Sequence, residues 1–361
     1  MLSFLRDYGD VTFDEVPLCD VDRLVFAQLA YTDLQDAPRP APLSEALPCA
    51  RRCNREDPPA VRFGFQYKDD QKLCELAGCA RRYAGVTLAD YTCVYDPQDE
   101  VQFAAITLRL DSGAVLCVFR GTDNTLAGWK EDFNMAFLEA VPAQRLALGY
   151  LIRQGRDAAV LETIGHSKGG NLALYAAVMA EEPLQRRIRC AVSFDGPGLN
   201  ADVMASPGVK RMQQRVRVIM PQASLIGRLF EQPGTQRFVE SRVFSLLQHY
   251  PYYWKTKGAD FITAPGQTVM GGLLSNSVRG LMDRLSKEQM ERIIEAVYDV
   301  VEVTNARTVN DLLRGWIVNT GPVVRKLFAT DKETAALAIK VLANFFESAR
   351  DAIVDAVRGE Q

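Results

Sequence analysis

The chain has 361 residues and a mass of 40.1 kDa, which suits one large enzyme domain with an accessory segment better than a single small domain. Hydrophobic residues make up 48% and charged residues 24%, as in ordinary soluble globular proteins, so a mainly disordered or fibrous chain is excluded. The 42 Lys and Arg residues nearly balance 45 Asp and Glu residues, giving a net charge of −3 without a basic stripe. We therefore expect no nucleic-acid partner.

The sequence predicts a protein of the cytoplasm. Residues 1–5 are mainly apolar, but Arg6 and Asp7 follow at once, so the hydrophobic region of a signal peptide is missing. We expect no transmembrane segment, because no uncharged run of about 18 residues occurs later. The eight cysteines fit a reducing compartment, since Cys117 and Cys190 fall in apolar, strand-like runs.

Four of the cysteines could suggest a zinc site: Cys49, Cys53, Cys74 and Cys79. Their spacings are not Cys-x-x-Cys, however, and neither histidine of the chain lies nearby. We favour small, buried hydrophobic side chains in a loop-rich region. The sequence thus predicts neither a metal nor an organic cofactor.

The first third of the chain gives mixed signals. Apolar residues at helical spacing predict a helix over residues 21–31. Residues 35–70 are rich in Pro, Ala and Arg, which predicts an irregular excursion over the surface. We expect residues 1–90 to form a helical and irregular segment that packs on the core.

Residues 91–258 are expected to form that core. Two β-rich runs, 101–108 and 114–119, are joined by the turn residues Asp111-Ser112-Gly113, which predicts a hairpin. Helices and strands then alternate, which indicates parallel βαβ units and a sheet covered on both faces. We expect helices over 129–140, 143–154 and 168–180, and strands over 159–164, 189–194 and 216–220.

Strand signals stop beyond about residue 258. Two capping boxes, Ser286-x-x-Gln289 and Thr330-x-x-Glu333, each precede apolar residues at helical spacing. Residues 259–361 are therefore expected to be an amphipathic helical segment that packs on the sheet, caps its mouth or meets a partner.

The strongest chemical signal is the pentad Gly165-His166-Ser167-Lys168-Gly169, between a β-rich run and a helix of small residues. This strand-turn-helix context is the one that a nucleophile elbow requires. Its glycines let the helix pack close to the strand, and its serine is exposed in a strained turn. We predict Ser167 as a nucleophile.

A serine needs a general base, and histidine is the usual one because its ordinary pKa lies near neutrality. The chain has only two histidines, and the elbow geometry should turn His166 away from the line of attack. His249 is therefore the expected base. It follows the apolar run 243–248, which could be the last strand of the sheet. The aromatic residues 250–254 beside it could line an apolar acyl pocket, but we favour core and rim packing.

The acid that orients the histidine should lie between these two residues in the chain. Asp195 is favoured, because it stands where a strand gives way to a Gly/Pro turn at the sheet edge that also carries Ser167. Asp202 and Glu231 remain alternatives, and Glu240 is less well placed.

Two main-chain N–H groups are expected to bind the oxyanion of an acyl-transfer reaction. One belongs to Lys168, directly after the nucleophile, whatever its side chain does. The other belongs to Thr122, in the loop that opens after the strand ending at residue 119.

Three segments together resemble the class 3 (fungal-type triacylglycerol) lipases. They are Phe-Arg-Gly-Thr at 119–122, Trp-x-x-Asp at 129–132 and Gly-His-Ser-x-Gly-Gly at 165–170, in the same order as in those enzymes. With Trp-Lys-Glu-Asp-Phe-Asn-Met at 129–135, Phe-Asp-Gly-Pro-Gly at 194–198 and Gln-His at 248–249, the chain looks more closely like a bacterial lipase-like family of α/β-hydrolases.

The resemblance covers about residues 100 to 255 and implies an α/β-hydrolase fold, with Ser167 as nucleophile, His249 as base, and Thr122 and Lys168 as oxyanion donors. The chain departs from the lipases in two ways. Lys168 stands where they have Leu, and residues 218–224, where they place an Asn-Asp-x-x-Pro acid, contain no carboxylate. Asp195 is thus a substitute chosen by position.

The function that these residues predict is a serine hydrolase that cleaves carboxylic esters, lipase-like or esterase-like, through an acyl-enzyme. The expected substrate is a small-molecule or lipid ester, with transient contact at a lipid surface as a possibility. An acyltransferase with the same triad is one alternative. A non-catalytic interaction protein with an α/β-hydrolase fold is the other, since a fold does not fix a function. The sequence does not predict the oligomeric state.

Overall fold

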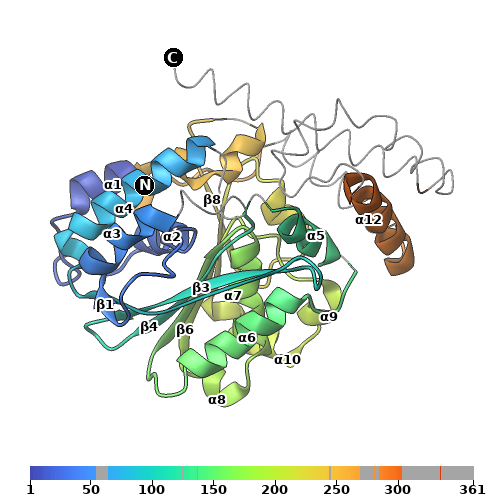
Figure 1. Cartoon of the computed structure of the whole chain (residues 1–361), viewed down its shortest axis with the longest axis horizontal. Coiled ribbons are helices and arrows are strands. Elements are labelled where there is room, and N and C mark those ends of the chain that lie inside the picture. Colours follow the sequence, from blue (N-terminus) through green and yellow to red (C-terminus); the bar gives the residue numbers. More distant parts are fainter. Residues whose placement is uncertain are drawn as a thin grey trace.

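The computed structural model describes residues 1–53, 64–123, 125–135, 137–243, 245–268 and 284–302, together with residues 280 and 334. Its centre is an eight-stranded sheet with the strands in chain order, β1 to β8 (Figure 1). Strands β1 to β4 pair antiparallel, whereas β4 to β8 pair parallel. The strands are β1 (Ala41–Pro42), β2 (Val86–Asp96), β3 (Val101–Leu110), β4 (Val115–Phe119), β5 (Leu161–His166), β6 (Ile188–Phe194), β7 (Val216–Pro221) and β8 (Thr235–Val239).

Helices cover both faces of this sheet (Figure 1). One face packs on the N-terminal helices and the aromatic residues that follow His249, in one continuous apolar core. The helices of that layer are α1 (Leu2–Tyr8), α2 (Asp20–Leu29), α3 (Leu43–Cys53) and α4 (Gly64–Cys79). The other face packs mainly on α6 (Pro142–Gln154), α7 (Lys168–Met179) and α10 (Pro207–Met212).

This mostly parallel sheet between two helical layers is an α/β-hydrolase fold, as expected. Every residue of β4 and β5 is buried, because each strand lies between two layers. The sequence of β4 is accordingly apolar, whereas β5 carries the buried polar residues Glu162, Thr163 and His166. The hairpin over residues 101–119 and the three later strands are confirmed, as are the helices expected near 21–31, 143–154 and 168–180. The helix expected over 129–140 is α5 (Leu126–Asn134) and ends sooner.

Three expectations were wrong, for residues 35–70, for the end of the strands at residue 258 and for residues 243–248. Residues 35–70 contain α3 and the beginning of α4. Helix α3 forms because buried Leu43, Ala46 and Leu47 supply an apolar face that outweighs the local Pro content. Strand β2 had no clear period-2 signal and was missed. A two-residue ribbon, β9 (Thr256–Lys257) with β10 (Asp260–Phe261), also continues past residue 258.

The third error concerns residues 243–248, which are not the last strand. The edge strand is β8, and the segment before His249 is a 3₁₀ helix, η5 (Ser245–His249). Two side-chain bonds explain the turn: Trp254 Nε1 donates to the Gln248 carbonyl (2.7 Å), and the Ala223 N–H donates to Gln248 Oε1 (3.1 Å). These two bonds hold the segment against its neighbours, where a strand would use main-chain hydrogen bonds to an adjacent strand.

The remaining helices are short or lie at the C-terminal side: η2 (Arg81–Tyr83), α8 (Glu182–Gln185), α9 (Ala201–Met204), η3 (Gln213–Arg215), η4 (Ile226–Arg228), η6 (Pro251–Tyr253) and α12 (Lys287–Glu302). The Ser286 capping box is confirmed, since Ser286 and Gln289 exchange bonds between side chain and main chain (2.9 and 3.2 Å). Helix α12 contacts α5 through the ion pair between Lys130 and Glu295 (3.2 Å). The Thr330 capping box lies outside the described residues.

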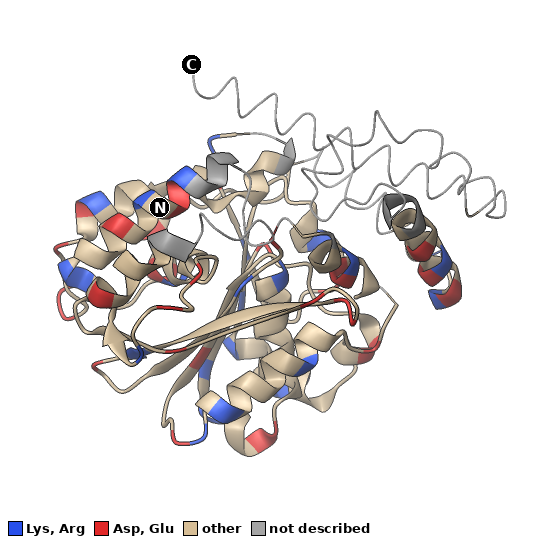
Figure 2. Ribbon diagram, in the orientation of Figure 1, with Lys and Arg blue, Asp and Glu red and all other residues tan. Residues whose placement is uncertain are grey.

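Charge and length add two observations. Figure 2 shows Lys and Arg interspersed with Asp and Glu over the helices, which agrees with the balanced composition. Within the residues that the structure describes, no helix combines the length and apolar character needed to cross a membrane. The division of the chain at residues 90 and 258 stays a prediction; β2 runs across the first of these boundaries.

Candidate active site

Ser167 occupies the tight turn between β5 and α7. Its backbone has φ 59° and ψ −132°, a strained conformation for a residue with a side chain. The flanking glycines are required by contact: a Cβ on Gly165 would collide with the Gly169 carbonyl, and a Cβ on Gly169 would collide with the Phe119 carbonyl. The local sequence therefore forces Ser167 into a half-buried position at the carboxyl end of the sheet.

Asp195 leaves the neighbouring strand β6 at the same edge. It is completely buried and also has a positive φ, 50°. The turn that follows packs against the elbow, since a Cβ on Gly196 would lie 2.9 Å from the Ser167 carbonyl oxygen. Glycine at 196 is what lets the acid and the nucleophile share this corner.

His249 meets this acid directly. Its Nδ1 lies 2.7 Å from Asp195 Oδ2, and the Ser224 hydroxyl donates to the other oxygen, Oδ1. Asp195 therefore fixes the tautomer with the proton on Nδ1 and leaves Nε2 as an acceptor. The imidazole side chain is 28% exposed, so a substrate can reach it, whereas the carboxylate is 1% exposed.

The second histidine holds the first one in place. His166 Nε2 donates to the His249 carbonyl (2.9 Å), and the two rings lie 4.7 Å apart between centroids. The Tyr31 hydroxyl, from the end of α2, lies 3.0 Å from His166 Nδ1. His166, the residue directly before Ser167, thus holds the His249 segment close to the elbow. No direct hydrogen bond joins the Ser167 hydroxyl to His249 within the described part of the chain.

The two expected oxyanion donors lie on either side of the elbow. Thr122 follows β4, and its hydroxyl donates to Asp132 Oδ2 (2.5 Å) on α5. Lys168 begins α7, and its side chain is fully buried, with Nζ bonded to Glu131 Oε2 (2.8 Å) and Gln102 Oε1 (2.9 Å). Burial raises the pKa of Asp132 to about 6, although the Lys168 charge and the Thr122 hydroxyl act to lower it.

The loop around Thr122 is held by a buried ion pair. Arg120 donates to Asp123 Oδ2 (3.3 Å), and Asp123 Oδ1 accepts from both the N–H (2.9 Å) and the hydroxyl (2.6 Å) of Thr125. Thr125 in turn caps the first turn of α5. These bonds preorganise the loop.

A family model described as Mbeg1-like matches residues 77–299, more than half of the 361 residues. The chain belongs to the Mbeg1-like family. The match begins in α4 and ends in α12, so Ser167, Asp195 and His249 all lie inside the Mbeg1-like region. No curated protein matches the sequence.

Two solved structures similar to this Mbeg1-like chain are lipases. One is a triacylglycerol lipase from Penicillium expansum, at 14% identity and a TM-score of 0.32, covering 56% of this chain and 80% of that one. The other is the extracellular lipase LipA from Serratia marcescens, at 12% identity and a TM-score of 0.34, covering 76% of this chain and 50% of that one.

The alternative acids lie elsewhere. Asp202 is exposed and pairs with Lys287 (2.7 Å) on α12. Glu240 pairs with Lys255 (3.1 Å), and Glu231 is exposed, with its main chain bridged to residue 199. Of the four carboxylates considered from the sequence, Asp195 is the one in contact with His249.

Three contacts of the site were missed by sequence reasoning. Ser224 had a signal, because it lies in the segment where lipases place their acid, and here it supports Asp195 from that position. Asp132 belongs to the Trp-x-x-Asp motif, but nothing in the motif indicated its contact with Thr122. Tyr31 gave no signal, since its partner His166 is distant in the sequence.

The cysteines considered as zinc ligands belong to helices α3 and α4 of the N-terminal layer. Among the described residues, no group of three or more His, Cys, Asp or Glu side chains is placed to hold a metal ion. Cys49 and Cys79 are free thiols. Cys53 has its side chain outside the described set.

Proposed function

We propose that this protein is a serine hydrolase that cleaves carboxylic esters through an acyl-enzyme on Ser167. The observation that carries the proposal is the 2.7 Å contact between His249 Nδ1 and the buried Asp195 carboxylate, at the sheet edge where Ser167 is held in a strained turn. An ester is preferred because of the motifs shared with the class 3 lipases.

Acylation begins when Ser167 Oγ attacks the carbonyl carbon of the ester. His249 Nε2 takes the hydroxyl proton, and Asp195 stabilises the resulting imidazolium. The substrate brings the serine and the imidazole into hydrogen-bonding contact, as is common for catalytic bonds that are long in a free enzyme. The developing oxyanion accepts hydrogen bonds from the N–H groups of Thr122 and Lys168.

The tetrahedral intermediate collapses with cleavage of the ester C–O bond. His249 returns its proton to the leaving alcohol, and the acyl group stays on Ser167. A water molecule then attacks the acyl carbon, again with His249 as base, and the carboxylic acid and the free serine are released.

A fluorophosphonate probe tests the proposal directly, because it reacts only with an activated serine. Wild type should be labelled, whereas Ser167→Ala should not be labelled at all. The matched control is Ser206→Ala, which precedes helix α10 and should be labelled like wild type, because α10 packs near the end of α7 and Ser167 precedes its start. Labelling that persists in Ser167→Ala would exclude Ser167 as the nucleophile.

Hydrolysis of p-nitrophenyl esters of increasing chain length gives the second measurement. His249→Ala and Asp195→Asn should each lower kcat by roughly 10³ to 10⁴, since the base is lost in the first and held in the wrong tautomer in the second. Asp202→Asn should stay within about twofold of wild type, because Asp202 lies away from His249. Equal losses in Asp195→Asn and Asp202→Asn would contradict the assignment of the acid.

A further inference from the structure

A buried cation lies directly behind the expected oxyanion site. The Lys168 side chain is 0% exposed, and its Nζ is bonded to Glu131 and Gln102. As the first residue of α7, Lys168 needs to supply only its main-chain N–H to the oxyanion site, and any residue except proline has that group. A buried ammonium group is expensive unless it is paired, and an apolar side chain would fill the same space at lower cost. The charge of Lys168 therefore calls for an explanation of its own.

The two carboxylates that face Lys168 are used differently. Glu131 is saturated: Oε2 accepts from Lys168 and from the Gln102 N–H (3.1 Å), and Oε1 accepts from the Ala143 N–H (2.7 Å). Asp132 has one bond, from Thr122 to Oδ2. Its buried Oδ1 receives no hydrogen bond from the described residues and lies 3.8 Å from Lys168 Nζ.

The ionisation of Asp132 therefore depends on Lys168. Burial opposes the carboxylate, and the negative charges of Glu131 and Asp123 oppose it further, whereas Lys168 is the main group that favours it. Tyr298, on α12, also faces this carboxylate, but burial raises its pKa well above the ordinary value, so it stays neutral at working pH. An ionised Asp132 accepts the Thr122 hydroxyl more strongly than a neutral acid does.

Thr122 is held through both branches of its side chain. Its hydroxyl is bonded to Asp132, and its methyl group packs on α5, where a Cβ on Gly128 would lie 3.0 Å from Thr122 Cγ2. Because both χ1 substituents are fixed, the main-chain N–H of Thr122 is fixed with them. The orientation of one oxyanion donor is thus linked, through Asp132, to the ammonium group that follows the nucleophile.

We propose that the Lys168 side chain is a positioning residue for the oxyanion hole: it keeps Asp132 ionised and aligned on Thr122, and so sets the Thr122 N–H in place for catalysis. This role is separate from that of the Lys168 main-chain N–H, and it rests on the proposed serine-hydrolase function. The role would explain why this chain has Lys168 at the position where the class 3 lipases have leucine.

The test is a double-mutant cycle between Lys168→Met and Thr122→Val, with p-nitrophenyl butyrate as substrate and fluorophosphonate titration to count reactive sites. Lys168→Met should lower kcat by about 10-fold with KM within about twofold, a smaller loss than for an oxyanion donor removed outright. In the Thr122→Val background the same change should lower kcat less than about threefold, because the link through the hydroxyl is already cut.

The pH profile supplies a readout that a merely structural role would not move. Activity requires ionised Asp132, so it should fall as the pH drops through about 6. Without Lys168 the pKa of Asp132 should rise further, which moves the acid limb of the profile toward neutral pH. An acid limb at the wild-type position in Lys168→Met would overturn the proposal.

Folding is controlled in two ways. Arg82→Met removes another buried cation, paired with Asp22 at 2.6 Å and far from the elbow, so it should lower Tm while kcat per titrated site stays at the wild-type value. If Lys168→Met alone does not fold, Lys168→Met/Glu131→Gln removes the cation without stranding the Glu131 charge. The kcat loss and the pH shift should then keep their direction but be smaller, because the Glu131 charge also acts on the pKa of Asp132.

The outcomes separate the two proposals. If wild type is labelled and hydrolyses the ester, but Lys168→Met keeps its kcat or loses as much activity in the Thr122→Val background, the positioning role is wrong and the hydrolase stands. If wild type is neither labelled nor active, the hydrolase proposal fails, and the role of Lys168 is overturned with it.

Discussion

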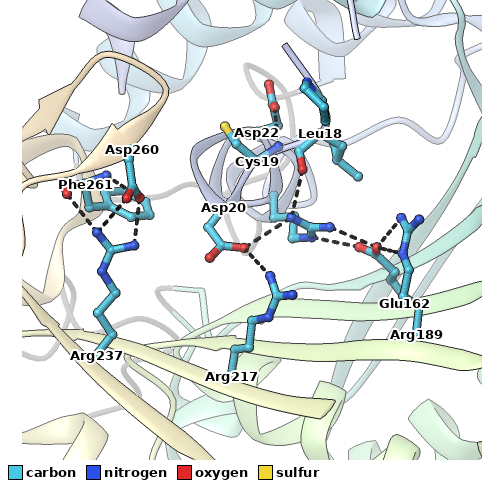
Figure 3. Close-up of polar contacts among 12 residues, drawn as sticks. Leu18, Cys19, Asp20, Asp22, Glu162, Arg189, Arg217, Arg237, Asp260 and Phe261 are labelled. Carbon is cyan, nitrogen blue, oxygen red and sulfur yellow. Dashed lines mark hydrogen bonds and ion pairs between the residues drawn. The ribbon is translucent and has the colours of Figure 1, made fainter. Parts of the chain in front are cut away.

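Strand β5 has a buried ionic cluster at each end, and the two are built in different ways. At its amino end, Glu162 accepts from Arg23 through Oε2 (2.8 Å) and Oε1 (2.9 Å), and Arg189 adds a bond to Oε1 (2.7 Å) (Figure 3). Both carboxylate oxygens are satisfied. At the carboxyl end, Asp132 has one oxygen bonded to Thr122 and the other without a hydrogen bond from the described residues.

The pKa values of the two acids move in opposite directions. Burial alone would raise the pKa of Glu162, but the hydrogen bonds and charges of Arg23 and Arg189 lower it overall. For Asp132 burial prevails, and the pKa rises to about 6. The amino-end cluster therefore stabilises the fold at neutral pH, whereas the carboxyl-end cluster keeps an acid in an unfavourable charge state. Incomplete satisfaction of a buried group marks the end where chemistry is proposed.

The saturated cluster continues across the sheet. Arg217 on β7 pairs with Asp20 (3.2 Å), and Arg237 on β8 pairs with Asp260 (2.7 Å) (Figure 3). Arg217 and Asp260 are at least half exposed, so each of these pairs should contribute little, about 0 to 1 kcal/mol. The contribution to stability is thus concentrated at Glu162, where α2 crosses the sheet.

The largest effect is expected from Arg23→Met. It leaves Glu162 completely buried with one exposed partner, Arg189, and should lower the free energy of unfolding by about 3 kcal/mol at pH 7. Urea denaturation measures this change. Because the substitution lies at the amino end of β5, kcat per titrated site should stay at the wild-type value. A loss of kcat with unchanged stability would reverse the assignment of the two ends.

The control for Arg23→Met is Arg189→Met, whose side chain is 50% exposed and whose loss should lower stability by about 1 kcal/mol. The pH dependence adds a check of sign. The lowered pKa of Glu162 stabilises the fold above the unfolded value near 4.5, and this contribution disappears as the pH falls through the folded value. The difference between wild type and Arg23→Met should therefore shrink below pH 4.5.

A smaller effect, mainly on activity, is expected from Ser224→Ala. The substitution removes the hydroxyl that donates to the buried Asp195 and leaves one carboxylate oxygen without that donor. We expect kcat to fall about 10-fold, with stability lower by about 1 to 2 kcal/mol. The matched control, Ser224→Thr, keeps the hydroxyl. If both variants lose the same activity, packing at residue 224 and not the hydrogen bond is responsible.

The sequence predicted the sheet and the elbow because both rest on local patterns. The buried parallel strands β4, β6 and β7 are mostly apolar runs, and the pentad around Ser167 has a steric reason for each glycine. His249 could be singled out because only two histidines exist. Asp195 could be favoured because the carboxyl ends of neighbouring parallel strands meet at one edge.

The missed features depend on contacts between distant segments. Lys168 and Asp132 are separated by 36 positions, and nothing local to either residue indicates the other. The error at residues 243–248 has the same origin, because Gln248 is held by Trp254 and by the main chain of Ala223. A short apolar run fits a strand or a 3₁₀ helix equally well, and tertiary bonds decide between them.

Asp132→Asn should distinguish the two ends of β5 most clearly, through the pH dependence of its stability. Since the folded protein holds a proton on Asp132 up to about pH 6 and the unfolded chain only to about 3.8, stability falls as the pH rises through this window. Asparagine removes that penalty, so the variant should be about 1 kcal/mol more stable than wild type at pH 7.5 and no more stable at pH 4. The value is kept small because the Asp132 side chain is 29% exposed and solvent screens its charge.

Activity should change the other way in the same variant, with kcat about 10-fold lower, because a neutral amide accepts the Thr122 hydroxyl less strongly than a carboxylate. Glu162→Gln is the matched control at the other end of the strand: it should lose stability at pH 7.5 and keep its kcat. Urea denaturation at pH 4 and pH 7.5 compares the two. An Asp132→Asn variant that is less stable than wild type at pH 7.5 would mean that the ionised carboxylate stabilises the fold, and the two clusters would then be alike.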